Sequence, residues 1–426
     1  MTDQRRLPAS RIGRLTRLAA LGARTGAGLL LSKDGASAAR HAAEVLGTLR
    51  GIAAKLGQMA SYVDGVVPEE QRAAYETALR GLRAAAPSSS PAAIRRAVEE
   101  DLGAPIEELF TEWEDAPFAS ASIGQVHRAT LPDGRRVAVK VQHPGIARAV
   151  ESDLDNAGVL EGMLGALGAR RFESKRIFEE IKQRFREELD YALEAERQRA
   201  FADLHAGDPE IHIPAVIAER SSARVLTSEL AHGRELEEIA GDSEAERRAF
   251  AETLWRFVFK GNLVGGMFNA DPHPGNYLFG RDGRVVFLDF GCVEPIVGER
   301  LDRARALHHA ALSGDEDHFA RLAARILETR GGRYERLAIA YSRRCFEPIF
   351  ASPFRIDRAF SASLAEELKA LALQARTFDD AEVAPLPPGM LFMNRLQIGF
   401  YSVLARLDVE VDYAAIERGF LPPIGG

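Results

Sequence analysis

The chain is poor in cysteine and in long hydrophobic runs. Only two cysteines, Cys292 and Cys345, occur among 426 residues, and they match neither a metal-ligand spacing nor a disulfide framework. No uninterrupted run of about 18 or more apolar residues occurs, so the sequence predicts no transmembrane helix. These features argue against a disulfide-rich secreted protein and an integral membrane protein, and they favour a cytoplasmic location.

An excess of positive charge is missing too. The formal net charge is −7 at pH 7, from 55 Lys and Arg against 62 Asp and Glu, which gives no support to nucleic-acid binding. A chain of 426 residues is long enough for two or three lobes with a substantial core. The sequence leaves the oligomeric state open.

Basic residues are nevertheless concentrated near the N-terminus. Six arginines fall within the first 24 residues, and Ile12, Leu15 and Leu18 interleave with them at a spacing of three. This pattern suits a helix that lies on an anionic membrane surface. A helix docked on its own protein with its charges solvated fits equally well. Residues 1–35 therefore carry the hypothesis of a peripheral membrane contact.

Two motifs in the second half of the chain indicate phosphoryl-transfer chemistry. Asp271 is followed five residues later by Asn276, and a short apolar run ends at Asp289 in an Asp-Phe-Gly sequence. Phosphoryl transfer needs a carboxylate beside the attacking group and oxygen ligands for Mg²⁺ from separate points of the chain. Asp271 suits the first role, and Asn276 with Asp289 suits the second. A helix-capping Asp271 is the alternative.

A lysine on a predicted strand lies upstream of both motifs. Apolar residues alternate around Lys140 in the segment Val137–Val141, which predicts a strand. Kinases hold nucleotide phosphates with a lysine on such a strand. A single lysine would be read more simply as a surface residue, but the order of the three motifs favours a nucleotide site. We expect Ala138 and Glu229, the latter in the linker between lobes, to lie beside the nucleotide.

The glycine-rich loop that covers the phosphates in kinases is missing. The segment 116–127 keeps a single glycine, and small residues occupy the other positions. Alanine does not easily adopt positive φ, so this loop should be stiffer than a glycine loop. An ordinary turn of small residues is the alternative. The predicted phosphate-facing residues are Ala119, Ser120, Ala121, Ser122, Gly124 and Val126.

Taken together, the motifs resemble those of the UbiB (AarF) family of atypical kinases. Lys55-Leu56-Gly57-Gln58 is similar to the Lys-x-Gly-Gln motif of that family, and Glu188-Leu189-Asp190 is similar to its Glu-x-Asp motif. The resemblance extends from about residue 46 to the C-terminus. One departure is Asn269, where relatives usually carry His.

This resemblance implies a bilobal, protein-kinase-like α+β fold that is predominantly helical and has an N-terminal helical extension. It implies a division into residues 1–105, 106–230 and 231–426, and ATP or ADP with Mg²⁺ as cofactors. It also implies that Glu194 holds Lys140 in place. The family-specific residues Lys55, Gln58, Glu188 and Asp190 are expected at the cleft, with the two carboxylates facing Lys55 or a metal.

The Ala-Pro-Glu sequence that ends the activation segment of protein kinases is absent as well. We therefore expect no platform for protein substrates, and we expect a small-molecule or lipid substrate or coupled ATP hydrolysis. The resemblance points to isoprenoid-quinone or membrane-lipid metabolism. A nucleotide-binding regulatory scaffold with little turnover is the alternative, favoured by the stiff loop and Asn269. An antibiotic-type phosphotransferase is disfavoured by the Lys-x-Gly-Gln motif.

Apolar periodicity also predicts individual elements. It predicts a helix from Pro91 to about Leu102 and a continuous helical stripe through Phe185, Leu189 and Leu193, which would point Glu188 and Glu194 the same way. The other predicted elements are a hairpin at Pro132–Gly134, strands at 213–218 and 224–229, a hairpin through 277–279 and 285–288, and a C-terminal helix from Met390.

Overall fold

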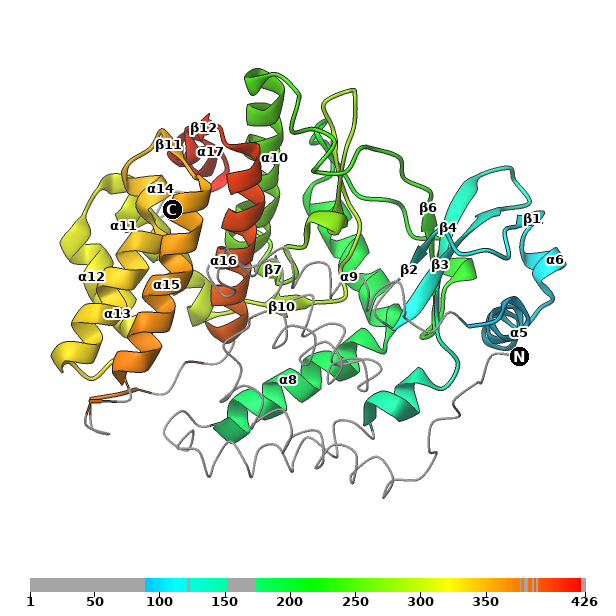
Figure 1. The fold of residues 1–426 in the computed structure, drawn as a ribbon, viewed down its shortest axis with the longest axis horizontal. Coiled ribbons are helices and arrows are strands. Elements are labelled where there is room, and N and C mark those ends of the chain that lie inside the picture. Colours follow the sequence, from blue (N-terminus) through cyan, green and yellow to red (C-terminus); the bar gives the residue numbers. More distant parts are fainter. Residues whose placement is uncertain are drawn as a thin grey trace, which may run out of the picture.

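The computed structural model describes residues 89–120, 123–151, 174–375, 377–378, 382–384, 387 and 390–422. A small lobe built around an antiparallel sheet lies at one end of the molecule, and a helical large lobe lies at the other (Figure 1). The bilobal α+β prediction is confirmed. Residues 1–35, Lys55, Gln58, Ala121 and Ser122 lie outside the described residues, so the roles predicted for them stay predictions.

The small-lobe sheet positions Lys140. Its strands run in the order β1 (Glu112–Trp113), β3 (Gly124–Thr130), β4 (Arg136–Gln142) and β6 (Val225–Glu229), and β2 (Ala119–Ser120) also pairs with β3. The predicted hairpin joins β3 to β4, with Gly134 at a φ of 85°. Lys140 is paired with Val126 on one side and Leu226 on the other, so two neighbouring strands fix its backbone.

Helix α5 (Pro91–Leu102) covers this sheet. Its bounds match the predicted helix: Ser90 caps its N-terminus, Pro91 occupies the first turn and Gly103 ends it with a φ of 76°. Ile94 and Val98 are fully buried in one cluster with the β-branched residues of the sheet. Although the predicted boundary at residue 105 assigned α5 to the extension, the helix packs as part of the small-lobe core.

The predicted continuous helix around residue 189 is wrong. The chain forms α8 (Ser174–Glu188) and α9 (Tyr191–Leu204), and Asp190 is the N-cap between them. The Asp190 carboxylate accepts hydrogen bonds from the backbone N–H groups of Ala192 and Leu193, a geometry that starts a new helix. Glu188 therefore ends one helix, whereas Glu194 lies in the first turn of the next.

The strand predicted at 213–218 is also wrong. Strand β5 (Ile211–His212) is shorter and pairs with β9 (Val285–Phe287) of the large lobe. After it, a single bridge joins Val216 to Ser228, and a 3-10 turn covers Ala218–Arg220. Pro214 has no N–H to donate, which disfavours a continuous ladder at this position.

The large lobe surrounds α10 (Glu244–Leu263), whose N-terminus carries a capping box between Ser243 and Glu246. Two antiparallel strand pairs flank the segments that carry Asp271, Asn276 and Asp289: β7 (Met267–Asn269) pairs with β10 (Val293–Pro295), and β8 (Tyr277–Phe279) pairs with β9. The remaining elements are α6 (Ile106–Leu109), α11 (Glu299–Ser313), α12 (Glu316–Ile326), α13 (Gly332–Cys345), α14 (Glu347–Phe350), β11 (Phe354–Arg355), α15 (Arg358–Ala375), α16 (Met390–Leu407), β12 (Glu410–Val411) and α17 (Tyr413–Phe420).

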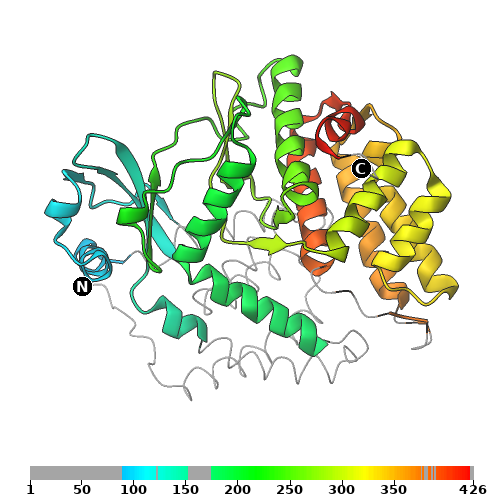
Figure 2. The same cartoon turned by 180° about the vertical axis from the view of Figure 1, so that it is seen from behind.

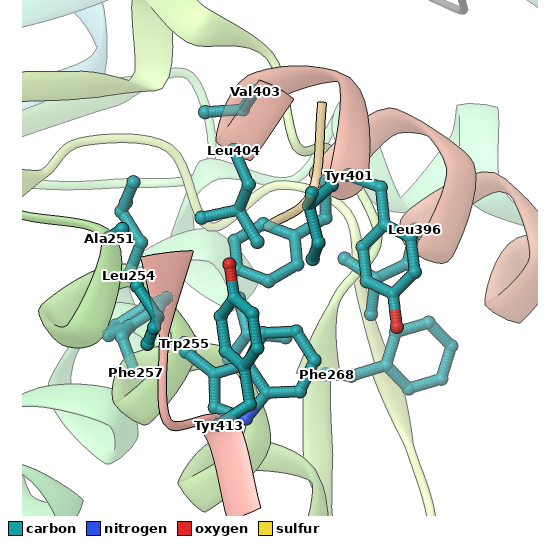
Figure 3. Packing of buried hydrophobic residues seen from close by; sticks show 14 of the residues in the cluster. Ala251, Leu254, Trp255, Phe257, Phe268, Leu396, Tyr401, Val403, Leu404 and Tyr413 are labelled. Atoms are coloured by element: carbon teal, nitrogen blue, oxygen red, sulfur yellow. The ribbon is translucent and has the colours of Figure 1, made fainter. Parts of the chain in front are cut away.

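Trp255 of α10 lies at the centre of the large-lobe core. Its ring contacts Tyr413 at a centroid distance of 4.2 Å, and Leu396, Tyr401 and Leu404 of α16 belong to the same cluster (Figure 3). The indole N–H donates to the carboxylate of Glu417, which is fully buried and also pairs with His308. The predicted C-terminal helix is present as α16, and its stripe of Leu396, Phe400, Leu404 and Leu407 is buried.

We expect His205 to make the stability depend on pH. Its ring is 3% exposed and stacks on Phe201 and Phe257. Burial and the nearby Lys260 lower its pKa to about 4. Since an unfolded His titrates near 6.5, the unfolded chain binds more protons between these values, and stability falls as pH falls. We expect the free energy of unfolding to drop by about 2 kcal/mol more in wild type than in His205→Phe between pH 7.5 and 5.

Denaturant unfolding at several pH values measures this difference. The exposed His318 provides the control, since His318→Gln should keep the wild-type dependence on pH. Parallel curves for wild type and His205→Phe would show that His205 is not the linked group.

Candidate active site

Lys140 forms an ion pair with Glu194 between the sheet and α9. The Lys140 Nζ lies 2.7 and 2.9 Å from the two Glu194 carboxylate oxygens and 3.8 Å from Asp289 Oδ2. The Lys140 side chain is 19% exposed and that of Glu194 is 3% exposed. The pairing that the family resemblance implied is therefore present, and the same cation also faces the Asp-Phe-Gly carboxylate.

The electrostatics keep Lys140 positively charged. Burial alone would lower the pKa of Lys140, but the carboxylates of Asp289 and Glu194 outweigh burial and hold this pKa well above its ordinary value. Lys140 is consequently a fixed cation at neutral pH. A fixed cation that is still partly exposed suits the recognition of nucleotide phosphates.

Tyr191 lies beneath this lysine, a role that the motif analysis missed. The Lys140 Nζ lies 4.9 Å from the centre of the Tyr191 ring. A Cβ on Gly124 would come within 2.4 Å of the Val141 carbonyl oxygen and 2.8 Å of the Tyr191 hydroxyl. Gly124 thus permits close packing against Tyr191. The sequence held one signal for Tyr191, its position directly after the Glu-x-Asp motif.

The loop from Asp271 to Asn276 is held by its own hydrogen bonds. His273 caps the 3-10 turn at Pro274–Asn276, and the Asn276 side-chain amide donates to the Asp271 carbonyl oxygen at 2.9 Å. This bond uses the amide nitrogen, so Asn276 Oδ1 is the atom suited to a cation. The Leu288 N–H donates to the Asn276 carbonyl oxygen at 3.0 Å and joins this loop to the segment that carries Asp289.

Asn269 ties the two halves of the site together. Its side-chain nitrogen donates to the Asp289 carbonyl oxygen, and its side-chain oxygen accepts from the Asp271 N–H at 3.1 Å. The adjacent Ala270 N–H donates to the Cys292 carbonyl oxygen at 2.7 Å. The residue that departs from the family pattern therefore links the backbones at both candidate catalytic carboxylates.

The carboxylate of Asp289 is oriented by its surroundings. Its Oδ1 accepts from the Gly291 N–H at 2.9 Å, and the side chain is 31% exposed. Arg197 donates to the Gly291 carbonyl oxygen at 2.9 Å, a contact that the sequence did not signal. Phe290 is fully buried against Phe201 at a centroid distance of 5.2 Å. The buried ring and the two hydrogen bonds hold the partly exposed Asp289 carboxylate beside Lys140.

Asn276 and Asp289 offer one amide oxygen and one carboxylate from two segments joined by hydrogen bonds. Such a donor set fits Mg²⁺, which is commonly held by one or two protein oxygens together with phosphate oxygens and water. The hydrogen bonds described above leave an oxygen available on the amide of Asn276. The site therefore suits a Mg-nucleotide chemically, with Lys140 supplying a fixed cation beside it.

The other predicted residues are placed as follows. Ala119 and Ser120 form the exposed strand β2 at the edge of the sheet. Ala138 lies opposite Ser228, and Glu229 ends β6 beside it, so both belong to the strands that lead to the linker. Glu188 is buried at the end of α8, whereas Asp190 is exposed and caps α9. The binding and catalytic roles of all these residues stay predictions.

Comparison with known proteins agrees with this geometry. The family model described as the ABC1 atypical kinase-like domain matches residues 81–323. The chain belongs to this family of atypical kinase-like proteins, in agreement with the UbiB resemblance.

Particular relatives support the same family. The atypical kinase COQ8B, mitochondrial, of Rattus norvegicus is 28% identical over 96% of this chain and 80% of its own length. The atypical kinase coq-8, mitochondrial, of Caenorhabditis elegans is 31% identical over 74% of this chain and 45% of its own length. The Mycobacterium tuberculosis protein Rv3197, solved in complex with erythromycin, is 28% identical, with a TM-score of 0.60 over 96% of this chain and all of that one.

The Lys140–Glu194 ion pair should show strong energetic coupling. A double-mutant cycle of Lys140→Met and Glu194→Gln, measured by denaturant unfolding, should give a coupling energy of about 1.5–3 kcal/mol because the pair is largely buried and charge-assisted. The exposed pair Glu299–Arg303 on α11 serves as the control and should give about 0.3–0.5 kcal/mol. Equal coupling energies in the two cycles would contradict a structural role for the buried pair.

Proposed function

We propose that this protein binds a Mg-nucleotide at the candidate active site and uses ATP as an atypical kinase or ATPase. The observation that carries the proposal is the single connected set of Lys140, Glu194 and Asp289. The Lys140 cation meets carboxylates from α9 and from the Asp-Phe-Gly segment within 2.7 and 3.8 Å. Membership of the atypical kinase-like family supports the same chemistry.

In this proposal each side chain has a distinct task. Lys140 binds the α- and β-phosphates, and Glu194 keeps the lysine in position. Asn276 and Asp289 would hold Mg²⁺, which neutralises the phosphate charge when it is bound. Asp271 orients the attacking hydroxyl or water and accepts its proton. Asn269 acts through the backbone, because it fixes the distance between the segments that carry Asp271 and Asp289.

We further propose a small molecule or lipid as the substrate, or ATP hydrolysis coupled to isoprenoid-quinone or membrane-lipid metabolism. The relatives named as COQ8 atypical kinases support the quinone assignment. The solved relative in complex with erythromycin shows that a protein of similar fold binds a small molecule. Among the described residues, no helix is long and apolar enough to cross a membrane. Residues 1–35 remain the proposed contact with an anionic membrane surface.

Asp289→Asn should weaken Mg-dependent nucleotide binding. Removing the carboxylate takes away a charged ligand of the cation, and we expect a loss of about 1.5–3 kcal/mol in Mg-ADP affinity. Calorimetric titration with and without Mg²⁺ measures the change. Asp282→Asn is the matched control, because Asp282 lies exposed in the turn between β8 and β9. Unchanged Mg-dependent affinity in Asp289→Asn would remove Asp289 from the metal site.

Asp271→Asn should separate catalysis from binding. We expect Mg-ADP affinity close to that of wild type and ATP turnover reduced by roughly 10²–10⁴-fold, the usual contribution of a general base. Phosphate release is measured with and without anionic vesicles and quinone precursors. If residues 1–35 contact the membrane as proposed, any effect of the vesicles on ATP turnover should disappear when these residues are removed. Turnover by wild type no higher than that of Asp271→Asn would favour the regulatory scaffold.

A further inference from the structure

Arg197 joins helix α9 to the segment that follows Asp289. Helix α9 lies between the small-lobe sheet and β10 (Figure 1). Arg197 follows Glu194 by three residues, so the two side chains project from neighbouring positions on one face of the helix. Glu194 holds Lys140, and Arg197 Nη1 donates to the Gly291 carbonyl oxygen at 2.9 Å. One helix face therefore contacts both the phosphate-binding lysine and the Asp-Phe-Gly segment.

Gly291 transmits the contact with Arg197 to the carboxylate of Asp289. The Gly291 N–H donates to Asp289 Oδ1 at 2.9 Å, while the Gly291 carbonyl oxygen accepts from Arg197. A Cβ on Gly291 would lie 3.3 Å from Asp289 Oδ1 and 3.5 Å from Glu194 Oε2, so this glycine packs between the two carboxylates. Since both backbone polar groups of Gly291 are engaged, the guanidinium of Arg197 fixes the residue that orients Asp289.

The guanidinium of Arg197 is itself held in place. Its Nη2 donates to Glu187 Oε2 at 2.5 Å, and the side chains of Arg197 and Glu187 are 13% and 15% exposed. Arg184 donates to the same oxygen of Glu187 at 2.7 Å and to the Val293 carbonyl oxygen at 3.2 Å. Replacing Arg197 therefore leaves Glu187 paired with Arg184 and creates no isolated buried carboxylate.

We infer that Arg197 is a positioning residue for Asp289. Its guanidinium is engaged by Glu187 and Gly291, so it acts on a bound nucleotide only through Asp289. The inference rests on the proposed function, because it requires Asp289 to hold Mg²⁺. Without the bond from Arg197, Gly291 is free to move and the Asp289 carboxylate loses its fixed orientation. The binding of Mg²⁺ with the nucleotide should suffer, whereas the contact between phosphate and Lys140 should not.

Calorimetric titration of the full-length protein with ADP tests this inference. The quantity to compare is the Mg²⁺ enhancement, which is the ratio of the ADP dissociation constant without Mg²⁺ to that with Mg²⁺. Arg197→Met removes the hydrogen-bond donors at similar side-chain length. We expect the Mg²⁺ enhancement to fall roughly three- to tenfold, the effect of one hydrogen bond. The ADP affinity without Mg²⁺ should stay close to that of wild type.

Two further variants separate positioning from packing. Arg199→Met is the matched control, because Arg199 lies exposed on the same helix, and it should leave the Mg²⁺ enhancement unchanged. Arg197→Lys keeps a cation and an N–H donor, so it should retain more of the Mg²⁺ enhancement than Arg197→Met. Thermal unfolding verifies that each variant is folded.

Hydrogen exchange without nucleotide or Mg²⁺ supplies a readout that does not depend on the metal or on turnover. Loss of the bond from Arg197 should loosen the Gly291 N–H from Asp289. We expect the backbone amides of residues 288–293 to exchange roughly three- to tenfold faster in Arg197→Met than in wild type. Arg199→Met should exchange like wild type.

Four outcomes would overturn the inference while the proposed function stands. They are equal Mg²⁺ enhancement in wild type and Arg197→Met, a loss of ADP affinity that is the same with and without Mg²⁺, equal Mg²⁺ enhancement in Arg197→Lys and Arg197→Met, and unchanged hydrogen exchange of residues 288–293. The absence of any Mg²⁺ enhancement in wild type would instead refute the proposed metal site, and the inference with it.

Discussion

The ion pair between Lys140 and Glu194 is the interaction on which the candidate active site depends. Lys140 is held by the small-lobe sheet, Glu194 belongs to the first turn of α9, and Asp289 approaches from the large lobe. Figure 2 shows α9 between the sheet and the large lobe. A cation with so little exposed surface needs both carboxylates, and these carboxylates fix its position. The break at Asp190 is what brings Glu194 to the lysine, because it starts a new helix there.

A second set of contacts holds the Asp-Phe-Gly segment against the corner between α8 and α9. Glu187 accepts from Arg184 at 2.7 Å and from Arg197 at 2.5 Å, and these arginines also donate to the carbonyl oxygens of Val293 and Gly291. Despite partial burial, the two guanidinium groups keep the pKa of Glu187 below its ordinary value. The helices that carry the family-specific carboxylates are therefore bonded directly to the backbone that follows Asp289.

Much of this arrangement could be predicted from the sequence, since it lies in short motifs. The order of the motifs along the chain indicates a nucleotide site that includes Lys140, Asp271, Asn276 and Asp289. The alternation of apolar residues placed Lys140 correctly on β4. The break before Tyr191 was missed because spacing by three or four continues across it, and the N-cap bonds of Asp190 outweigh that pattern. The hydrogen-bond partners of Arg197, Gly291 and Glu187, lie 94 and 10 residues away in the sequence. No local sequence pattern predicts the contact with Gly291.

The departure at Asn269 gave the regulatory-scaffold alternative part of its support from sequence, and the structure weakens that part. A neutral histidine offers one donor and one acceptor from its two ring nitrogens. Asn269 offers the same pair from one amide and uses both, the donor toward the Asp289 carbonyl oxygen and the acceptor toward the Asp271 N–H. Because the hydrogen-bonding capacity is conserved, the substitution alone gives no reason to expect the two candidate catalytic carboxylates to separate.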